Sequence, residues 1–397
     1  IREFSLLVII NLFVGSMVGL ERTVLPLLGE EQFGLASASA ALSFIVSFGF
    51  SKAAMNFFAG SIADRIGRKK VLLLGWGVGL FVPVLVIFAT HWWVIVFANV
   101  LLGINQGLTW SMTVNMKVDL VKGTQRGLAI GLNEFAGYSG VALAAAVSGF
   151  IAASYSLRPE PFYLGIGIVR AGLLLSFTGK DTEKHLQLQA RMQRRKAADP
   201  VNPRDIFLKT TWRDSTLFSC SFAELSTNLK DGMAWGLFPI FFATAGLSVG
   251  QIGTLVALYP ASWGFFQLFT GALSDRIGRK WMIAAGMWTQ AAAIWWILFV
   301  NHYVLWIVGA IVLGLGTAMV YPTLQAAISD VAHPDWRASA MGVYRLWRDS
   351  GYAFGALMGG ILADVLNVSW AVGLVAFLPL LAGMVIALRM KETLIRK

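Results

Sequence analysis

A short basic turn between two long apolar runs occurs twice in this chain. Residues 60–70 read Gly-Ser-Ile-Ala-Asp-Arg-Ile-Gly-Arg-Lys-Lys, and residues 271–280 read Gly-Ala-Leu-Ser-Asp-Arg-Ile-Gly-Arg-Lys. The second copy follows the first by 211 residues (271 − 60 = 211), and the same shift relates Asp119 to Asp330. A constant register over such a distance indicates an internal repeat. The chain is therefore predicted to contain two parallel copies of one structural unit.

The runs on either side of these turns are apolar enough to lie in a membrane. Of 397 residues, 57% are hydrophobic and 13% are charged, whereas soluble domains carry roughly 25% charged residues. One membrane crossing takes about 20 helical residues. The sequence predicts an all-α polytopic membrane protein with twelve transmembrane helices. Their expected positions are 4–28, 37–62, 71–90, 92–116, 127–153, 161–178, 217–245, 252–273, 281–300, 303–328, 339–362 and 369–388.

Basic residues follow every second span. The loop after the first span contains Glu30 and Glu31 without Lys or Arg, whereas the turn after the second contains Arg65 and Arg68. Because cytoplasmic loops carry an excess of Lys and Arg, both termini are predicted to be cytoplasmic, in a bacterial inner membrane. The same rule explains the net charge of +11, so no nucleic-acid partner is predicted.

One polar segment divides the chain. Residues 179–213 are rich in Lys, Arg, Gln and acidic side chains and contain two prolines. We expect a cytoplasmic linker there, between an N-terminal six-helix bundle at 1–178 and a C-terminal six-helix bundle at 214–397. The lone Cys220 lies in an apolar stretch and offers no disulfide framework or thiol metal site.

Two six-span halves, a basic linker and the pattern Gly-x-x-x-Asp-Arg-x-Gly-Arg-Lys after spans two and eight resemble the major facilitator superfamily of secondary transporters. The resemblance covers essentially the whole chain. It implies that the Asp of the pattern lies beside a gating helix of the opposite half, and that its Arg pairs with an acid ending the fourth span of its own half. The implied cytoplasmic gate residues are Gly60, Asp64, Arg65, Gly67, Arg68, Asp119, Asp275, Arg276, Arg279 and Asp330.

The glycines of these turns are expected to let the turn approach neighbouring backbones, and the charges to act as a latch that releases when the cytoplasmic side opens. The alternative is that the basic turns only fix orientation in the membrane.

Two positions depart from the proton-driven drug antiporters of this superfamily. Those proteins usually carry Arg-x-x-x-Gly in span four, where this chain has Asn99 before Gly103. They also carry Gly-Pro-x-x-Gly-Gly in span five, where this chain has Gly137-Tyr-Ser-Gly140 and no proline. The departures weaken the hypothesis of drug efflux and leave it as an alternative.

Ionisable residues inside the predicted spans are the candidate substrate and proton path, because a charge at the bilayer centre costs roughly 2.5–3.5 kcal/mol. Spans one and seven line the central path in the superfamily and carry two adjacent pairs, Glu21 with Arg22 and Lys230 with Asp231. Adjacent helical residues point about 100° apart, so Glu21 and Arg22 are expected to find partners on other helices.

Spans five and eleven carry opposite charges at equivalent repeat positions, Glu134 and Arg345 (345 − 134 = 211). The pair predicts either an ion pair across a cavity or a binding site. Arg345, Arg348 and Asp349 share one face of span eleven, and two arginines favour an anionic or zwitterionic solute. The alternative is a self-satisfied network with Glu134, Asp231 and Asp349.

Three further residues complete the candidate path. Lys52, with Asn56 one turn on, is either a solute ligand or the counter-ion of an acid on span eleven. Trp235 lies one turn after Asp231 and is a candidate lining residue. Glu224 is expected nearer the cytoplasmic surface and is set aside.

The sequence therefore predicts a secondary active transporter that moves a small polar, anionic or zwitterionic organic solute by alternating access. Proton coupling is expected through Glu21, Glu134 or Asp231. The alternatives are a proton-driven multidrug or lipophilic-cation exporter and an uncoupled uniporter or channel. No enzyme, metal or cofactor is predicted, because no metal-ligand cluster, phosphate-binding loop or activated nucleophile appears. The expected partners are the solute, protons and membrane lipid, and the chain is expected to be monomeric.

Overall fold

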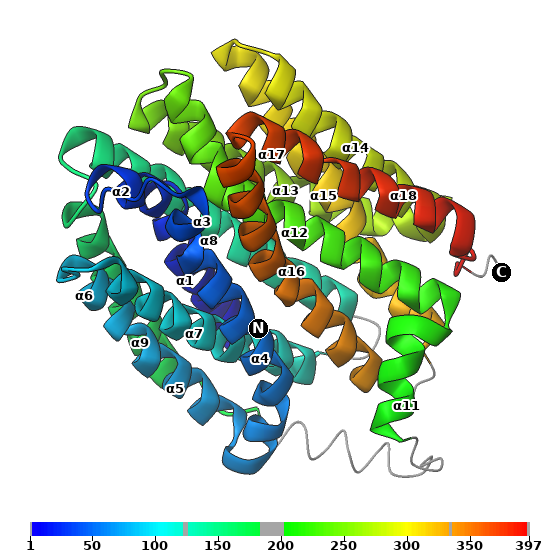
Figure 1. Ribbon diagram of the computed structural model, residues 1–397. Helices are drawn as coiled ribbons and strands as arrows, with labels where there is room; N and C mark the ends of the chain where they lie inside the picture. The colour runs from blue at the N-terminus through cyan, green and yellow to red at the C-terminus, as the bar shows by residue number, and fades with distance from the viewer. Residues whose placement is uncertain (1, 122–125, 183–201, 333–335, 395–397) are drawn as a thin grey trace.

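The computed structural model describes residues 2–121, 126–182, 202–332 and 336–394, and all regular secondary structure in these ranges is helical (Figure 1). Nine helical stretches of the described residues are long and apolar enough to cross a membrane by length and composition. The remaining spans, α4, α12 and α16, carry the predicted site charges Lys52, Lys230 with Asp231, and Arg345 to Asp349.

The N-terminal half contains six spans, three of them broken into two helices. They are α1 (Arg2–Arg22) with α2 (Val24–Glu31), α3 (Ala38–Ala41) with α4 (Ser43–Ile66), α5 (Arg68–Gly79) with α6 (Phe81–Ile87), α7 (Trp92–Leu120), α8 (Arg126–Ser154) and α9 (Glu160–Thr178).

The C-terminal half repeats this plan. A short helix, α11 (Pro203–Leu208), and a π-helix (Lys209–Arg213) lead into it. Its spans are α12 (Ser215–Thr244), α13 (Val249–Ile277), α14 (Arg279–Phe299), α15 (Tyr303–Val331), α16 (Arg337–Val365) and α17 (Val368–Val375) with α18 (Phe377–Arg389). The prediction of twelve spans in two parallel six-helix repeats is confirmed. Residues 183–201 of the expected linker lie outside the described residues.

Each of the two repeated turns contains a glycine with a positive φ, which other residues rarely adopt. Gly67 joins α4 to α5 with φ +92°, and Gly278 joins α13 to α14 with φ +116°. Only glycine enters this region of φ without a steric penalty. The two turns therefore mark the same end of each half, which we call the basic end. The loops at 32–37 and 366–367 mark the opposite end.

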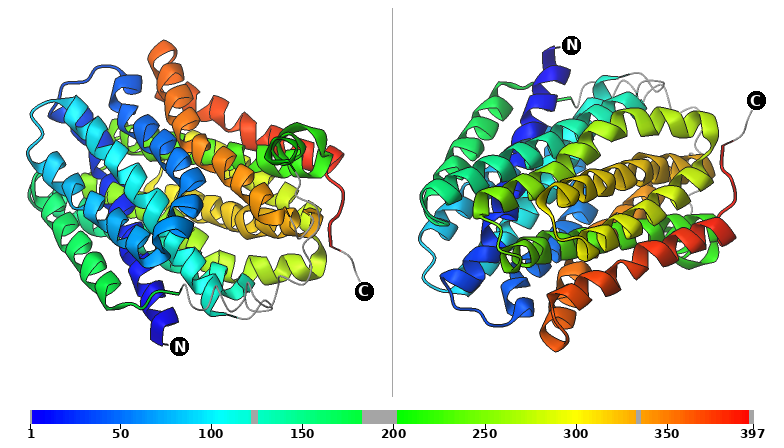
Figure 2. Two further views of the ribbon diagram at one scale, coloured as in Figure 1. Left: turned by 90° about the horizontal axis from the view of Figure 1, so that it is seen from below. Right: turned by 90° about the horizontal axis from the view of Figure 1, so that it is seen from above.

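The halves lie side by side, as both views in Figure 2 show. Within the halves, α1 packs against α8 and α12 packs against α16; between the halves, α4 contacts α16 and α8 contacts α13. The packing within each half is very close. A Cβ added at Gly140 would lie 1.9 Å from the carbonyl oxygen of Leu12, and one added at Gly355 would lie 1.8 Å from that of Leu229.

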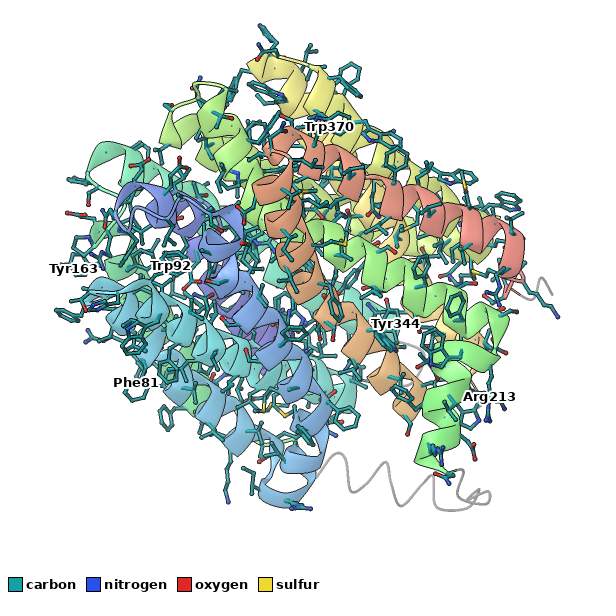
Figure 3. The ribbon with its side chains drawn as sticks, viewed as in Figure 1. Phe81, Trp92, Tyr163, Arg213, Tyr344 and Trp370 are labelled. Atoms are coloured by element: carbon teal, nitrogen blue, oxygen red, sulfur yellow. The ribbon has the colours of Figure 1, made fainter. Side chains whose placement is uncertain are left out.

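The outside of the bundle is apolar. Phe81, Tyr163 and Trp370 project from it (Figure 3) and are 60%, 56% and 61% exposed. Large apolar side chains on the surface of a helical bundle are typical of helices that face lipid. Tyr344, in contrast, is fully buried between helices (Figure 3). Several charged side chains, among them Glu21, Lys230 and Asp231, are buried as well.

Candidate functional site

A central pocket between the halves is lined by several of the charged residues that the sequence predicted. The free space inside it in the present conformation is small, about that of one water molecule. Its walls come from α4, α7, α8, α15 and α16. The lining residues are Asn56, Trp110, Ser111, Val114, Glu134, Gln325, Arg345 and Arg348.

Glu134 and Arg345 line this central pocket together without forming an ion pair in the described part of the chain. Glu134 is 6% exposed. Its Oε1 accepts hydrogen bonds from the Trp110 indole (2.9 Å) and the Asn133 amide (3.3 Å), and its Oε2 has no partner. The repeat thus brings two equivalent residues to one cavity, where each retains capacity to bind a third molecule.

Asp349 is the centre of a buried charge cluster beside the pocket. Its carboxylate accepts two parallel hydrogen bonds from Arg348, from Nε at 2.9 Å and from Nη2 at 3.0 Å. The Asn56 amide also donates to it, and Lys52 Nζ lies 3.8 Å away across the interface between the halves. This geometry favours Lys52 as a counter-ion to an acid of span eleven. Arg348 is neutralised locally, whereas Arg345 is not.

The ammonium of Lys52 lies among aromatic rings. It is 5.6 Å from the ring centroids of both Phe48 and Trp110 and 5.3 Å from that of Tyr352. Such distances allow cation–π attraction. Phe48 and Tyr352 also meet Trp235 edge to face, at 5.1 and 6.4 Å between centroids. We call the rings of Phe48, Trp235 and Tyr352 the aromatic wall; they come from α4, α12 and α16.

Lys230 and Asp231 belong to a buried hydrogen-bond network that joins α12 to α13 and α15. Both are fully buried, and the Lys230 ammonium donates to Asp231 Oδ1 (2.7 Å), to Thr317 (2.9 Å) and to the hydroxyl of Tyr259. The Tyr259 hydroxyl in turn donates to Asp231 Oδ1, while Oδ2 has no partner. Although these two residues are sequence neighbours, the long lysine side chain folds back to reach the carboxylate.

Glu21 and Arg22 form no ion pair with each other, and their environments differ. Glu21 is fully buried, and neither carboxylate oxygen has a hydrogen-bond partner. Arg22 lies over the Trp235 ring of the other half at 5.0 Å. Glu224, which was set aside for its position toward the basic end of α12, is fully buried, and both of its carboxylate oxygens also lack partners. Burial by neighbouring helices, which a sequence position does not reveal, makes it a further candidate.

The Arg–acid pairs implied by the resemblance are present at the basic end of both halves. Arg68 Nη1 lies 2.6 Å from Asp119 Oδ2, and Arg279 Nε lies 3.2 Å from Asp330 Oδ2. Arg279 also pairs with Asp275 at 2.5 Å.

Each of these two acids, Asp119 and Asp330, accepts a hydrogen bond from a threonine, and the two threonines are related by the same shift of 211 residues (393 − 182 = 211). Thr182 donates to Asp119 at 2.9 Å, and Thr393 donates to Asp330 at 3.2 Å. The repeat therefore extends to the segments that follow α9 and α18.

The other predicted gate residues make fewer contacts with their neighbours than these arginine–acid pairs. Arg65 and Arg276 are exposed, and the side chain of Asp64 lies outside the described residues. The expectation that the glycines allow close approach does not hold for Gly60, because nothing lies within 4 Å of a Cβ added there. Gly67 is needed instead for its positive φ.

The halves are joined tightly at the opposite end. The Asp364 carboxylate, at the end of α16, accepts from Ser37 Oγ (2.8 Å), the Ala38 amide (2.5 Å) and the Ser39 amide (3.1 Å), and also from Ser39 Oγ. It thereby caps α3 of the other half. In contrast, a Cβ added at Gly131 or Gly342, near the basic end, meets nothing within 4 Å. The structure therefore shows the halves closed at the opposite end.

Sequence reasoning missed Tyr259, Thr317 and Asp364. Each is a common residue type without a local pattern, and each acts on a residue far along the chain, so no sequence signal relates the partners. Across the described ranges, no group of three or more His, Cys, Asp or Glu side chains is arranged to hold a metal ion.

Comparison with known proteins gives a consistent result for sequence and fold. The family model described as Major Facilitator Superfamily matches residues 5–229 and 220–394. The quinolone resistance protein NorA of Staphylococcus aureus (strain MRSA252) is 24% identical over 152 residues, which cover 37% of this chain and 39% of that protein. The uncharacterized MFS-type transporter MJ1560 of Methanocaldococcus jannaschii is 23% identical over 184 residues, 46% of this chain and 48% of that one. The chain thus matches less than half the length of these curated relatives.

Solved structures share the fold over nearly the whole chain. The partially occluded inward-open xylose transporter XylE from E. coli has a TM-score of 0.77 and 14% identity, covering 99% of this chain and 98% of its own. A bacterial homolog of the human lysosomal transporter Spinster, inward-facing and unoccupied, has a TM-score of 0.74, 14% identity and coverage of 98% and 97%. At this identity the likeness concerns the fold alone.

Proposed function

The chain belongs to the major facilitator superfamily, whose members are transporters, and we propose that it moves a small zwitterionic organic solute through the central pocket, coupled to protons. The proposal is carried by one observation. Arg345 and Glu134 line the same pocket, and neither is neutralised by the other or by another ion pair in the described chain.

A solute with a carboxylate and an ammonium matches these two side chains. Arginine binds a carboxylate through two parallel hydrogen bonds, and the free Oε2 of Glu134 can accept from an ammonium. A purely anionic solute would leave Glu134 unpaired in a mostly buried site, which costs free energy. The zwitterionic class therefore fits better than the anionic class.

The proposed mechanism is alternating access. Asp364 holds the halves together at the opposite end, and Lys52 and Asp349 hold them at mid-depth. Near the basic end, Gly131 and Gly342 face open space. If the basic end is cytoplasmic, as its arginines and lysines favour, the present conformation faces inward. The Arg68 and Arg279 clusters would then be gate elements that contact the other half only when the basic end closes.

Proton coupling is assigned to Glu134 first. Its side chain lines the pocket and its Oε2 is unpartnered, so a bound ammonium and a proton would compete for the same carboxylate. Glu21 and Glu224 are alternatives, because both are fully buried without hydrogen-bond partners.

The test is transport in proteoliposomes with and without a pH gradient, using an amino acid-like zwitterion, a monoanion and a lipophilic cation. Arg345→Gln is expected to weaken zwitterion binding about 10- to 150-fold, the value of one charge-assisted hydrogen bond. Glu134→Gln is expected to remove the response to the gradient. Arg204→Gln and Glu31→Gln, at exposed positions, are the charge-matched controls. Gradient-driven zwitterion transport that survives both Arg345→Gln and Glu134→Gln would overturn the proposal.

A second candidate function is export of quinolone-type drugs. It is favoured by the partial similarity to the quinolone resistance protein, and quinolones that carry a carboxylate and a basic amine have the same charge pattern. Asn99 in place of the antiporter arginine, and the absence of proline from 137–140, speak against it. Adding such a quinolone to the transport panel distinguishes the two candidates: preference for the quinolone over the amino acid-like zwitterion would favour drug export.

A further inference from the structure

A fully buried lysine in the N-terminal half has no acid beside it. Lys117 lies in the last turn of α7 and is 0% exposed. Its ammonium donates one hydrogen bond, to the side-chain oxygen of Asn133 on α8 at 2.5 Å. In the part of the chain that the structure describes, Lys117 forms no ion pair and lies over no aromatic ring. A buried ammonium without a carboxylate carries a large desolvation cost.

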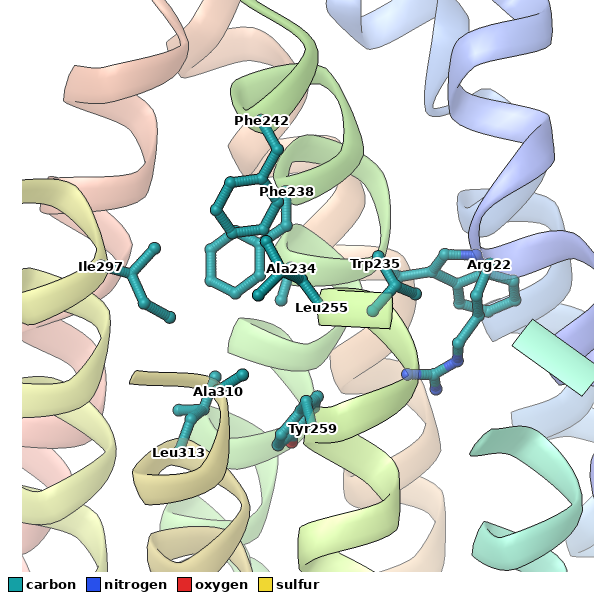
Figure 4. A pocket seen from close by; sticks show the side chains of 11 residues that line it. Arg22, Ala234, Trp235, Phe238, Phe242, Leu255, Tyr259, Ile297, Ala310 and Leu313 are labelled. Carbon is teal, nitrogen blue, oxygen red and sulfur yellow. The ribbon is translucent and has the colours of Figure 1, made fainter. Parts of the chain in front are cut away.

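The other buried cations of the described residues each have an acid or an aromatic ring beside them. Three of them pair with acids, namely Lys230, Arg279 and Arg348. The fourth, Arg22, lies 5.0 Å from the centroid of the Trp235 ring (Figure 4). Lys117 has neither kind of partner, so its charge has to be balanced at longer range.

The internal repeat shows that packing at this position does not need a charge. The residue 211 positions further on is Ile328 (328 − 117 = 211), which is also 0% exposed. An isoleucine therefore fills the equivalent place in the C-terminal half. The ammonium of Lys117 is costly to bury and unnecessary for packing, which indicates a role for its charge.

A single amide group connects Lys117 to Glu134. The Asn133 side chain is fully buried; its oxygen accepts from Lys117, and its nitrogen donates to Glu134 Oε1 at 3.3 Å. A lysine can only donate and an ionised carboxylate can only accept, so the two charges fix the orientation of the amide between them. The backbone carbonyl of Asn133 is held as well, because it accepts from Asn11 of α1 at 2.6 Å. Among the described charged residues, Glu134 is the one that acts electrostatically on Lys117.

We propose that Lys117 is the internal counter-ion of Glu134 and acts on it through the amide group of Asn133. The Trp110 indole, the other donor to Glu134, is neutral and leaves the negative charge of the carboxylate uncompensated. Opposite charges at the two ends of one amide polarise it and strengthen both hydrogen bonds. The ammonium therefore stabilises the ionised carboxylate when no solute is bound, and the carboxylate offsets part of the cost of burying Lys117.

Two other cations act on Glu134, but each has a different partner. Lys52, from α4, is paired with an acid of α16. Arg345, from α16, lines the central pocket and is assigned to the solute carboxylate. The other titratable groups that act on Glu134 are the hydroxyls of Tyr138 and Tyr321. Among the described residues, Lys117 is thus the cation beside Glu134 that neither an acid of its own nor the solute neutralises.

The consequence for solute binding rests on the proposed function, whereas the pairing of Lys117 with Glu134 does not. The ammonium of the solute and that of Lys117 are like charges that act on the same carboxylate, so each weakens the binding of the other. Lys117 therefore balances Glu134 after the solute has left, and it lowers the affinity for the solute ammonium so that the solute dissociates more readily.

The first experiment is a double-mutant cycle on thermal unfolding of the solute-free full-length protein in detergent. Lys117→Met and Glu134→Gln are each expected to lower the unfolding midpoint, and the double variant is expected to lower it by less than the sum, by at least about 2 °C. The control cycle pairs Glu134→Gln with Lys230→Met, which removes another fully buried lysine, and its effects are expected to add. Additive effects of Lys117→Met and Glu134→Gln would overturn the inference. If Lys117→Met does not fold, a folded double variant supports the pair and an unfolded one refutes it.

The second experiment measures the binding of leucine and of 4-methylpentanoate, which lacks the ammonium, by isothermal titration calorimetry in alkaline buffer. Lys117→Met is expected to bind leucine at least about 5-fold more tightly than the wild type and 4-methylpentanoate no more tightly. Lys117→Arg, which keeps the charge, is expected to bind both as the wild type does. A loss of packing would instead weaken both probes in Lys117→Met, and unchanged or weaker leucine binding there would overturn the role in solute binding. If the wild type binds neither probe, the proposed zwitterion site loses its support, while the unfolding cycle still decides whether Lys117 is the counter-ion.

Discussion

The contact between Asp364 and the start of α3 is expected to hold the halves closed at the end opposite the basic turns. Both carboxylate oxygens accept from a backbone N–H, Oδ1 from Ala38 and Oδ2 from Ser39, and Oδ2 also accepts from the Ser37 and Ser39 hydroxyls. In Asp364→Asn, only one oxygen remains to accept from a backbone N–H, whereas the serine hydroxyls can turn to accept from the new NH2 group. The side chain keeps its size, so the close approach of Gly360 to the Ser39 backbone is unchanged. The substitution therefore tests the hydrogen bonds alone.

The size of the effect follows from the number of bonds lost. Each hydrogen bond at this exposed site contributes about 0.5–1 kcal/mol, less than the 1.5–3 kcal/mol of a buried charged acceptor. The loss of one backbone N–H bond, together with the weaker bonds of a neutral side chain, amounts to about 0.5–1.5 kcal/mol, or roughly a 2- to 10-fold shift in the equilibrium between the closed and open states of this end. The full shift applies because the bonds join residues of different halves and exist only while this end is closed.

The assay is double electron–electron resonance between spin labels on the two halves. Tyr155→Cys and Asn301→Cys place the labels at exposed positions of this end, and Cys220→Ser removes the buried native thiol. We expect a longer-distance population to appear in Asp364→Asn. Glu31→Gln, which removes the same charge from an exposed position nearby, is the control. A distance distribution that is the same in Asp364→Asn as in Glu31→Gln would refute the reasoning.

Two further predictions concern packing and the C-terminal segment. Gly355→Ala places a Cβ 1.8 Å from the Leu229 carbonyl oxygen and is expected to destabilise the protein by about 1–3 kcal/mol. Gly342→Ala, on the same helix, meets no neighbouring atom and is expected to stabilise the protein by up to about 1 kcal/mol. Equal thermal unfolding midpoints of the two variants in detergent would contradict this prediction. Burial alone would raise the pKa of Glu392, but backbone N–H donors of Leu394, Arg279, Lys280 and Thr393 outweigh it and hold that pKa below its usual range. The ionised Glu392 therefore stabilises the contact of the C-terminal segment with Arg279 and Lys280 at any pH above its unfolded pKa of about 4.3, and this stabilisation is lost as the pH falls through the folded pKa. Hydrogen exchange should show the Arg279 and Lys280 amides protected at neutral pH in the wild type and less protected in Glu392→Gln. Equal protection in both proteins would count against this contact.

Several features of this protein could be predicted from the sequence because they depend on local pattern. Span positions follow from runs of apolar residues, and the repeat follows from the fixed register of two basic turns. The same register identified Glu134 and Arg345 as equivalent, and the structure places both at one pocket. The Arg68–Asp119 pair followed from the resemblance, since the family motif carries its partner with it.

The pairing of the buried charges was not predictable in the same way. The angle between adjacent helical residues correctly separates Glu21 from Arg22. Lys230 and Asp231 nevertheless pair with each other: the Tyr259 hydroxyl of another helix bonds to both, and Thr317 of a third helix accepts from Lys230. Nor does the position of Glu224 along its span reveal that neighbouring helices bury it fully.

Asp364 and Ser37 lie 327 residues apart, and no local pattern connects them. Hydropathy and period determine that a segment crosses the membrane and which residues share its face. The rotation of each helix about its axis and its depth against its neighbours depend on side-chain packing among all twelve spans. Those two quantities decide which charges meet, and they exist only in the assembled bundle.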